Sequence, residues 1–382
     1  MGRNTLVIAG LAIRALVTAI AVIAGGALAT AQTPPQPKPL LSEKVFKNVK
    51  VLTGLPVDQF MATMGFFSAS LGENCTFCHL LESGGSWEKY ADDNEQKRTA
   101  RRMIVMVAGI NKAYFGGRRV VTCYSCHRAG DRPLKTPSLT ELYGPPAPPR
   151  EPDDIVSTGP KDASVEQVFD RFIQALGGPD KLAKLTSFAA KGTSQNYPET
   201  QKYSVEVYAQ APGRRVIIVH SPNGDTTTAY DGRAGWLAGP TAERPLPLIE
   251  LTGGELDGAK LEAALSFPGQ IKQSLSQLRV GYPAEIDDRE VRLVQGTSDG
   301  RNPVNLYFDT KSDLLVRVVR YTESPVGLNP TQIDYSDYRE VVGVKIPFRW
   351  AVSWLDGRVT VELSDVQPNV PIDEARFAKP TR

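Results

Sequence analysis

Two short motifs contain all four cysteines of this 382-residue chain and two of its three histidines. Both have the pattern C-x-x-C-H: the first is formed by Cys75, Cys78 and His79, the second by Cys123, Cys126 and His127. Thiols spaced in this way on one helical turn reach the two vinyl groups of a haem and form thioethers, and the adjacent imidazole falls under the iron. The motifs therefore predict two covalently bound haem c groups, with both histidines as iron ligands.

Two other chemistries use closely spaced cysteines. A redox dithiol usually opens a helix within a βαβ unit, and the sequence predicts no such unit around either pair. A zinc ion could take all four thiols as ligands. However, the 44 residues between the pairs exceed the common spacing of about 15–20, and zinc leaves both following histidines unexplained. Haem attachment accounts for all six residues.

Each haem iron of an electron carrier usually has a second axial ligand as well. The remaining histidine, His220, lies in a strand-like stretch far from the motifs, and we expect it to be an ordinary sheet residue. Apart from the initiator, the methionines form two pairs, each shortly before a motif: Met61 with Met64, and Met103 with Met106. Each pair is spaced i, i+3 on a predicted helix, so both members face one side. We expect one methionine of each pair to bind iron; packing of both in a core is the alternative.

A mainly helical segment, residues 44–132, must position these ligands. Residues 57–67 and 95–114 carry apolar side chains at spacings of three and four, which predicts two helices, each with one methionine pair. A Pro-rich lead, residues 32–43, precedes the segment. A Pro-rich linker, residues 133–162, follows it and is expected to be an extended, semi-rigid spacer.

Residues 163–382 predict a domain of a different class. Ser164 and Gln167 form a capping box that begins an amphipathic helix. The rest alternates as strands without intervening helices, and residues 304–308 and 314–321 form a predicted hairpin. The expected fold is therefore multidomain α + β: a mainly α dihaem cytochrome domain, a linker, and a curved antiparallel β-sheet, a half-barrel, packed on helices.

The N-terminus indicates where the chain works. Residues 1–31 combine Arg3, an apolar stretch and the small-residue site Ala29-Thr30-Ala31, the pattern of a cleaved signal peptide. An uncleaved membrane anchor is the alternative, but the apolar run between Arg14 and Gln32 is 17 residues, at the short limit for a bilayer span. We expect a periplasmic protein that is not integral to the membrane after cleavage.

Composition excludes several classes of protein. The balance of 44 Lys and Arg against 42 Asp and Glu gives no support for a nucleic-acid partner. Four cysteines are too few for a disulfide-dense scaffold. The C-terminal domain has one histidine and no cysteine, so no nucleophile–base pair can be assigned there. A haem peroxidase needs an open iron position, which the paired methionines disfavour. We therefore expect an electron carrier rather than an enzyme.

The residues around both motifs resemble a known family. The first motif follows Gly54, Pro56 and Thr63-Met64; the second follows Arg101-Arg102-Met103, Ile110-Asn111 and Val121-Thr122. Over about residues 44–130 this resembles the first two haem segments of the cytochrome c subunit of photosynthetic reaction centres. The resemblance implies Met64 and Met103 as axial ligands, with Met61 and Met106 as second choices.

The same comparison also shows what differs in this chain. It has two motifs where the reaction-centre subunit has four, and it adds a C-terminal domain. A stand-alone carrier with an unknown redox protein partner is therefore favoured. Arg101, Arg102 and Arg128 lie near the ligands in sequence and could pair with haem propionates; solvated surface arginines are the alternative.

Short motifs in the C-terminal half resemble a second family. They include Pro212-Gly213-Arg214, Tyr230-Asp231-Gly232 and the stretch 342–347. These resemble outer-membrane lipoprotein-sorting carriers, which implies a curved antiparallel sheet closing over helices around an apolar cavity. The alternative function is therefore a module that binds a hydrophobic ligand or lipoprotein, with an attached redox domain.

Overall fold

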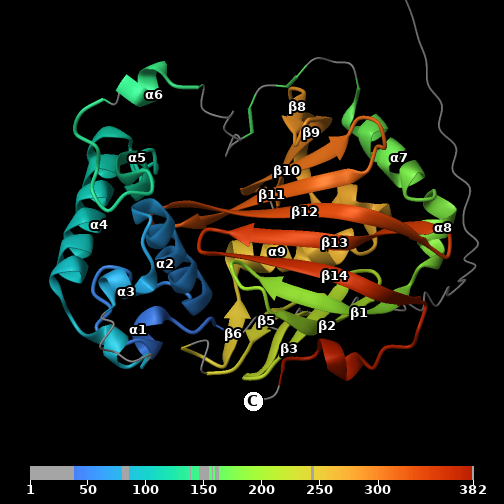
Figure 1. Ribbon diagram of the computed structural model, residues 1–382, viewed down its shortest axis with the longest axis horizontal. Coiled ribbons are helices and arrows are strands. Elements are labelled where there is room, and N and C mark those ends of the chain that lie inside the picture. The colour runs from blue at the N-terminus through green and yellow to red at the C-terminus, as the bar shows by residue number, and fades with distance from the viewer. Residues whose placement is uncertain are drawn as a thin grey trace, which may run out of the picture. The chain divides into compact units, whose positions relative to one another are not determined.

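The computed structural model describes residues 38–79, 86–137, 139–145, 155–156, 158–159, 163–241, 245–298 and 300–380. The predicted signal peptide lies outside these ranges, as do parts of the Pro-rich lead and of the linker. Residues 39–382 form one compact unit, in which an N-terminal helical segment packs against a large β-sheet (Figure 1). The predicted domain boundaries within that unit stay predictions.

The helical segment contains the elements that carry both motifs and both methionine pairs. They are α1 (Ser42–Val45), α2 (Val57–Leu71), α3 (Cys75–Cys78), the 3-10 helix η2 (Lys89–Ala91), α4 (Glu95–Tyr114) and α5 (Cys123–His127). Helices α2 and α4 confirm the two predicted helices. Helix α2 continues beyond the predicted end to Leu71, and Gly72 ends it in the left-handed region at φ 68°.

Strands in the described part of the chain form one open antiparallel sheet. They are β1 (Ser187–Asn196), β2 (Lys202–Gln210), β3 (Arg214–Ser221), β4 (Gly224–Tyr230), β5 (Gly235–Ala238), β6 (Leu248–Leu251), β7 (Ser276–Val280), β8 (Ala284–Ile286), β9 (Arg289–Ser298), β10 (Asn302–Asp309), β11 (Leu315–Ser324), β12 (Gly327–Val341), β13 (Val344–Trp354) and β14 (Gly357–Pro368). Their order is β6-β5-β4-β3-β2-β1-β14-β13-β12-β11-β10-β9-β7, and β8 pairs with β9. The predicted α + β class and the predicted hairpin, which is β10 with β11, are confirmed.

The main core lies between this sheet and its helices. The helices are α7 (Val165–Ala175), α8 (Pro179–Lys184), α9 (Gly253–Leu265) and the 3-10 helix η3 (Pro268–Ser274). The 3-10 helix η4 (Glu374–Phe377) packs through Phe377 into a separate, smaller buried cluster. Helix α7 begins at the predicted capping box. Its Phe169 and Phe172 contact Phe308 of β10 edge to face, with ring centroids 5.8 and 5.2 Å apart. Residues of α7, α9 and strands from both halves of the sheet share one buried cluster.

Helix α9 contradicts one prediction. The sequence predicted strands without intervening helices, but α9 lies between β6 and β7. Its buried residues include Gly258 and Ala263, which give no apolar stripe for a sequence pattern to show. A Cβ at Gly258 would lie 2.3 Å from the guanidinium carbon of Arg320 on β11, so glycine permits a close approach of the helix to the sheet. Similarly, one turn of helix, α6 (Leu139–Tyr143), lies where an extended linker was expected.

Candidate haem-attachment sites

The first motif forms one helical turn. Helix α3 begins after Asn74, whose Oδ1 accepts a hydrogen bond from the backbone N–H of Thr76 at 3.0 Å. Asparagine is a preferred residue at this position, because it satisfies a free donor at the start of a helix. Cys75 and Cys78 are the first and last residues of α3, His79 follows at once, and the thiols are free. This is the spacing that thioether attachment needs.

The imidazole of His79 is oriented for a metal. Its Nδ1 lies 2.9 Å from the carbonyl oxygen of Tyr90, and its ring stacks on the Tyr90 ring with centroids 4.5 Å apart. A carbonyl can only accept, so Nδ1 carries the proton in this hydrogen bond and Nε2 keeps its lone pair. Burial, together with the charge of Lys97, lowers the pKa of His79 and favours the neutral form that binds iron.

The second motif repeats this arrangement. Thr122 and Ser125 form a capping box at the start of α5, and Arg128 ends the helix in the left-handed region at φ 50°. His127 Nδ1 lies 3.0 Å from the carbonyl oxygen of Gly130. Histidine ligands of metals usually donate their other ring N–H to a carbonyl or carboxylate, which fixes the tautomer. Both motif histidines therefore present Nε2 as the available ligand.

The thiols also fit haem better than zinc. Burial raises the pKa of Cys78 and of Cys123, which disfavours the thiolates that a zinc ion binds. Within the described ranges, no three His, Cys, Asp or Glu side chains come together as a group that could hold a metal ion. The two cysteine pairs thus form two separate sites rather than one four-thiol cluster.

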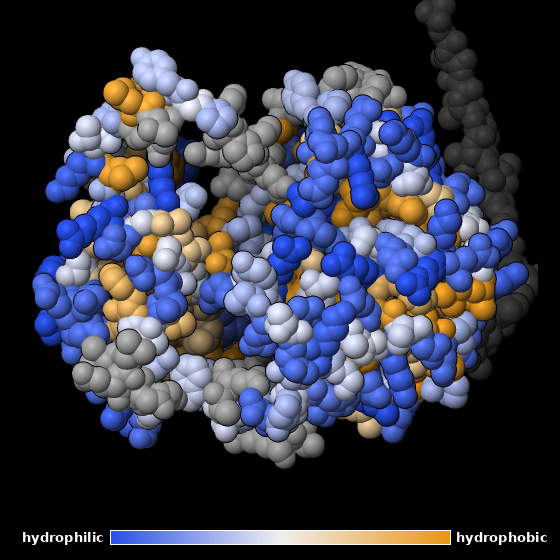
Figure 2. Space-filling model, viewed as in Figure 1, coloured by the Kyte–Doolittle hydropathy of each residue, from blue (hydrophilic) through white to orange (hydrophobic). Residues whose placement is uncertain are grey.

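Helix α4 presents an apolar surface that a flat macrocycle could cover. Met103 and Met106 are 37% and 47% exposed, and Val105 is 61% exposed. A Cβ at Gly109 would meet no atom within 4 Å, so the backbone is open beside the methionines. Figure 2 shows apolar residues among hydrophilic ones on this side of the molecule. Exposed apolar surface of this kind indicates a bound partner or ligand, and it lies next to both motifs, because α4 packs against α3 and α5.

The other methionine pair is half-buried on α2, which also packs against α5. The assignment of Met64 and Met103 as ligands stays a prediction. So does the role of the arginines. Arg101 pairs with Asp93 at 2.6 Å, and this hydrogen bond holds the pKa of Asp93 well below its usual range. Arg102 donates to the hydroxyl of Thr99 at 2.9 Å.

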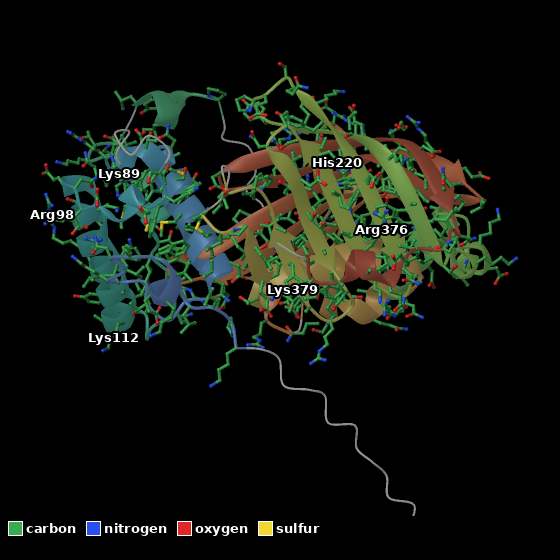
Figure 3. The ribbon with its side chains drawn as sticks, turned by 90° about the horizontal axis from the view of Figure 1, so that it is seen from below. Lys89, Arg98, Lys112, His220, Arg376 and Lys379 are labelled. Carbon is green, nitrogen blue, oxygen red and sulfur yellow. The ribbon has the colours of Figure 1, made fainter. Side chains whose placement is uncertain are left out.

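His220 lies on β3 of the sheet and pairs with Asp225 of β4 at 2.8 Å, as expected of an ordinary sheet residue (Figure 3). The same view shows Lys89, Arg98 and Lys112 on the helical segment.

Two supporting residues were missed from the sequence. Tyr90 orients His79, and Asp58 of α2 bonds to the sheet domain. The only sequence signal for Tyr90 was an aromatic residue eleven positions after the first motif. Asp58 has no local sequence signal, because its partner, Thr252, lies far away in the chain.

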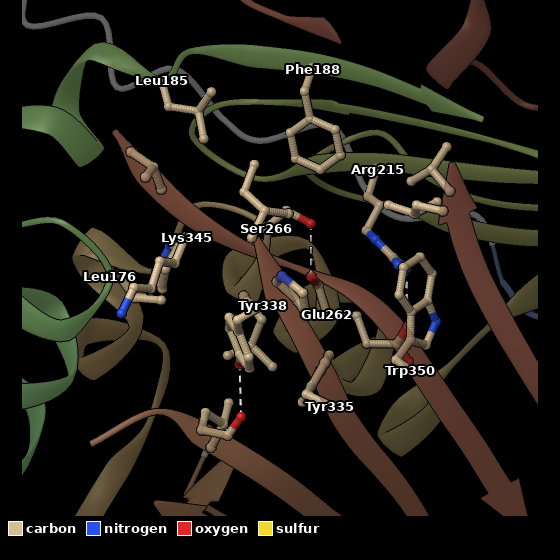
Figure 4. A pocket seen from close by; sticks show the side chains of 18 of the residues that line it. Leu176, Leu185, Phe188, Arg215, Glu262, Ser266, Tyr335, Tyr338, Lys345 and Trp350 are labelled. Carbon is tan, nitrogen blue, oxygen red and sulfur yellow. Dashed lines mark hydrogen bonds and ion pairs between the residues drawn. The ribbon is translucent and has the colours of Figure 1, made fainter. Parts of the chain in front are cut away.

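A second candidate site is a cavity of about 70 Å³ inside the sheet domain. Phe172, Phe188 and Trp350 contribute apolar walls. Figure 4 shows Phe188 and Trp350 beside the cavity. Arg215 and Glu262 form an ion pair of 3.1 Å at its side. The hydroxyl of Tyr335 has no hydrogen-bond partner among the described residues, whereas that of Tyr338 donates to the carbonyl of Leu315 at 2.7 Å. Burial raises the pKa of both tyrosines, so both hydroxyls stay protonated.

Comparison with known proteins places the helical segment in context. Residues 13–140 match the family model of the photosynthetic reaction centre cytochrome C subunit. The chain is 35% identical over 96 residues to the photosynthetic reaction center cytochrome c subunit of Roseobacter denitrificans, covering 23% of this chain and 25% of that protein. It is 36% identical over 97 residues to that of Thermochromatium tepidum, covering 24% and 22%. The first resemblance is thus confirmed for the N-terminal part, and the chain spans about a quarter of the curated relatives it matches.

Solved structures are similar to the other part of the chain. A LolA superfamily protein from Nitrosomonas europaea is 14% identical, with a TM-score of 0.39, over 57% of this chain and 98% of that one. A putative outer membrane lipoprotein-sorting protein domain from Vibrio parahaemolyticus is 10% identical, with a TM-score of 0.38, over 55% and 97%. In the described part of the chain, no helix has the length and apolar character needed to cross a membrane.

Proposed function

We propose that this chain is an extracytoplasmic dihaem c-type cytochrome that carries electrons. The proposal depends on one observation above all. Both C-x-x-C-H motifs form a helical turn in which the histidine has Nδ1 bonded to a backbone carbonyl and Nε2 available. Haem, when bound, supplies reversible one-electron chemistry between ferric and ferrous iron. The family match over residues 13–140 supports the same function.

Each group on the chain then has a defined role. Cys75 and Cys78 would hold one haem and Cys123 and Cys126 the other, and the hydrogen bond from each Nδ1 to a backbone carbonyl would help to orient the imidazole that binds the iron. A methionine thioether as the second ligand raises the reduction potential relative to a second histidine. We propose Met64 and Met103 for this role. With both axial positions filled by the protein, outer-sphere electron transfer is favoured over peroxidase chemistry.

Location and partner follow from the same proposal. Completion of c-type haem attachment outside the cytoplasm agrees with the signal-peptide pattern of residues 1–31, so we propose a periplasmic location. The partner is a redox protein that docks near the haem segment. Two motifs and an added sheet domain favour a free-standing carrier over a subunit of a photosynthetic complex.

The test uses full-length protein matured with haem. We expect two haems per chain by the pyridine haemochrome assay, and one haem after the double substitution of Cys75 and Cys78 by Ser. The red absorption band of methionine-ligated ferric haem should fall by about half in Met64→Ala and in Met103→Ala, since each haem contributes one such band. Met61→Ala and Met106→Ala are the matched controls. Fewer than two haems, or unchanged spectra in both Met64→Ala and Met103→Ala, would contradict the proposal.

The cavity supports a second candidate function, a module that binds a hydrophobic ligand. Its walls are mostly apolar, but the unpartnered Tyr335 hydroxyl and the Arg215–Glu262 pair offer polar contacts at one side. This combination suits an amphiphile with an apolar body and one hydrogen-bonding group. The cavity volume of about 70 Å³ is less than half of the roughly 150 Å³ of a cavity that binds benzene, so it admits only the end of a slender apolar chain.

Two tyrosines give a matched test of this second function. Binding of a fluorescent fatty acid to the haem-loaded chain should weaken in Tyr335→Phe, because a hydroxyl available to the ligand is lost. Tyr338→Phe should bind equally well but cost about 1 kcal/mol of stability, because its hydroxyl bonds to Leu315 within the protein. No binding by the wild type, or equal binding by both variants and the wild type, would remove this function from consideration.

A further inference from the structure

Helix α2, which carries one methionine pair, is also the helix that docks the haem segment onto the sheet domain. At its first turn, Asp58 accepts hydrogen bonds from Thr252, from the backbone N–H at 2.5 Å and from the hydroxyl at 2.8 Å. Gln59 donates to the same hydroxyl at 3.2 Å. Asp58 is only 7% exposed, so its carboxylate depends on these two donors.

The docking continues along the helix. Asn329 of β12 donates to the carbonyl oxygen of Ala62 at 3.1 Å. A Cβ at Gly327 would lie 2.4 Å from the ring of Phe66, and a Cβ at Gly65 would lie 3.2 Å from the carboxylate of Asp356. These are close approaches between the helix and the ends of strands, and Figure 1 shows α2 against β11 and β12.

The docked residues occupy one face of α2 and so fix its rotation. Successive residues of a helix are rotated by about 100°, which places Asp58, Gln59, Ala62, Gly65 and Phe66 within an arc of about 120° centred on Ala62. Met64 lies about 200° from Ala62, on the opposite face, and Met61 about 100° away, at the edge. The sheet therefore turns Met64 away from itself.

We propose that the sheet domain is a structural part of one redox centre: the contact of Asp58 with Thr252 is a latch that positions the axial methionine of α2. Thr252 is also the N-cap of α9, so the carboxylate lies at the positive end of a 13-residue helix, which favours this anchor. Asp58 and Thr252 are positioning residues that act through α2. The inference rests on the proposed haem function.

The test uses the full-length, haem-loaded chain and reads ligation rather than activity. In Asp58→Ala the carboxylate acceptor is lost, and we expect the red methionine band to lose up to half its intensity and one of the two midpoint potentials to fall. Asp58→Asn keeps an acceptor oxygen and should restore both. Thr252→Val removes the hydroxyl donor but keeps the backbone N–H, so it should show the same changes to a smaller extent. Thr297→Val, which removes a buried hydroxyl bonded to Ser276, is the matched control.

The outcomes separate this inference from the proposed function. If the wild type lacks two haems or the methionine band, the proposed function fails. If the wild type has both and every latch variant keeps the full band and both potentials, the latch alone is wrong. Should Asp58→Ala fail to mature, Thr252→Val decides, because it leaves Asp58 in place and removes the hydroxyl that donates to its carboxylate. A reduced band in Thr252→Val supports the latch, and an unchanged band overturns it.

Discussion

The latch predicts how stability depends on pH. Burial, reinforced by the charge of Glu255, raises the pKa of Asp58 from 3.8 to about 6 in spite of the hydrogen bonds from Thr252. The folded protein therefore holds a proton on Asp58 at pH values where the unfolded chain has lost it. The free energy of unfolding should then fall as pH rises from about 4 to about 6 and level off above that range.

The size of this effect follows from the shift. A change of about two pKa units, at about 1.36 kcal/mol per unit, amounts to about 3 kcal/mol. Asp58→Asn removes the titration but keeps an oxygen that can accept from Thr252. It should therefore be more stable than the wild type at pH 7, by up to about 3 kcal/mol, and nearly equal to it at pH 4.

Urea denaturation of the haem-loaded protein between pH 4 and pH 8 measures this difference. The comparison of wild type with Asp58→Asn cancels groups that titrate in both proteins, including Asp356, whose pKa burial also raises. Asp58→Ala serves as a second comparison, because it removes both the charge and the acceptor. Parallel stability curves for the wild type and Asp58→Asn would show that Asp58 does not titrate in this range and would refute the reasoning.

Other expectations follow from single contacts. Asn111 makes three hydrogen bonds to Val120 and Val121 just before the second motif, so Asn111→Ala should cost about 3 kcal/mol in urea denaturation; a loss below 1 kcal/mol would count against this. Gly258→Ala should cost about 1–3 kcal/mol, because a methyl group would displace the Arg320 guanidinium; wild-type stability would contradict that contact. The haem-free chain should show fast hydrogen exchange in α2 and α4 but slow exchange in the sheet. The reason is that the described part of residues 39–137 buries only four apolar side chains. Slow exchange throughout the chain would disprove this.

Local patterns account for what the sequence predicted well. The C-x-x-C-H spacing, the capping box of α7 and the β10–β11 hairpin each lie within about twenty consecutive residues, so their physics is visible in a short window. Helix α9 was missed for the opposite reason. It packs through Gly258 against Arg320, and glycine, which permits this close approach, is a poor helix former in a sequence.

Long-range contacts explain the rest. Asp58 and Thr252 are 194 positions apart, and neither stands out from ordinary polar residues until the fold joins them. The contact of Tyr90 with His79 could not be predicted either, because the group that bonds to the imidazole is a backbone carbonyl, which every residue type has. Residue types and spacing thus suffice to propose candidate cofactor-binding residues, and those assignments stay predictions, whereas the contacts that orient them appear only in the fold.

The two candidate functions, electron transfer and ligand binding, both involve helix α9. Helix α9 presents its N-cap, Thr252, to the carboxylate of Asp58 on the methionine-bearing helix. Its last turn contributes Glu262 and Leu265 to the wall of the cavity. A sheet domain that was merely tethered to a cytochrome would need no buried carboxylate at the junction, since an exposed linker joins independent domains without that cost. The electron carrier and the ligand-binding module are therefore better treated as parts of one folded unit than as rival interpretations of the chain.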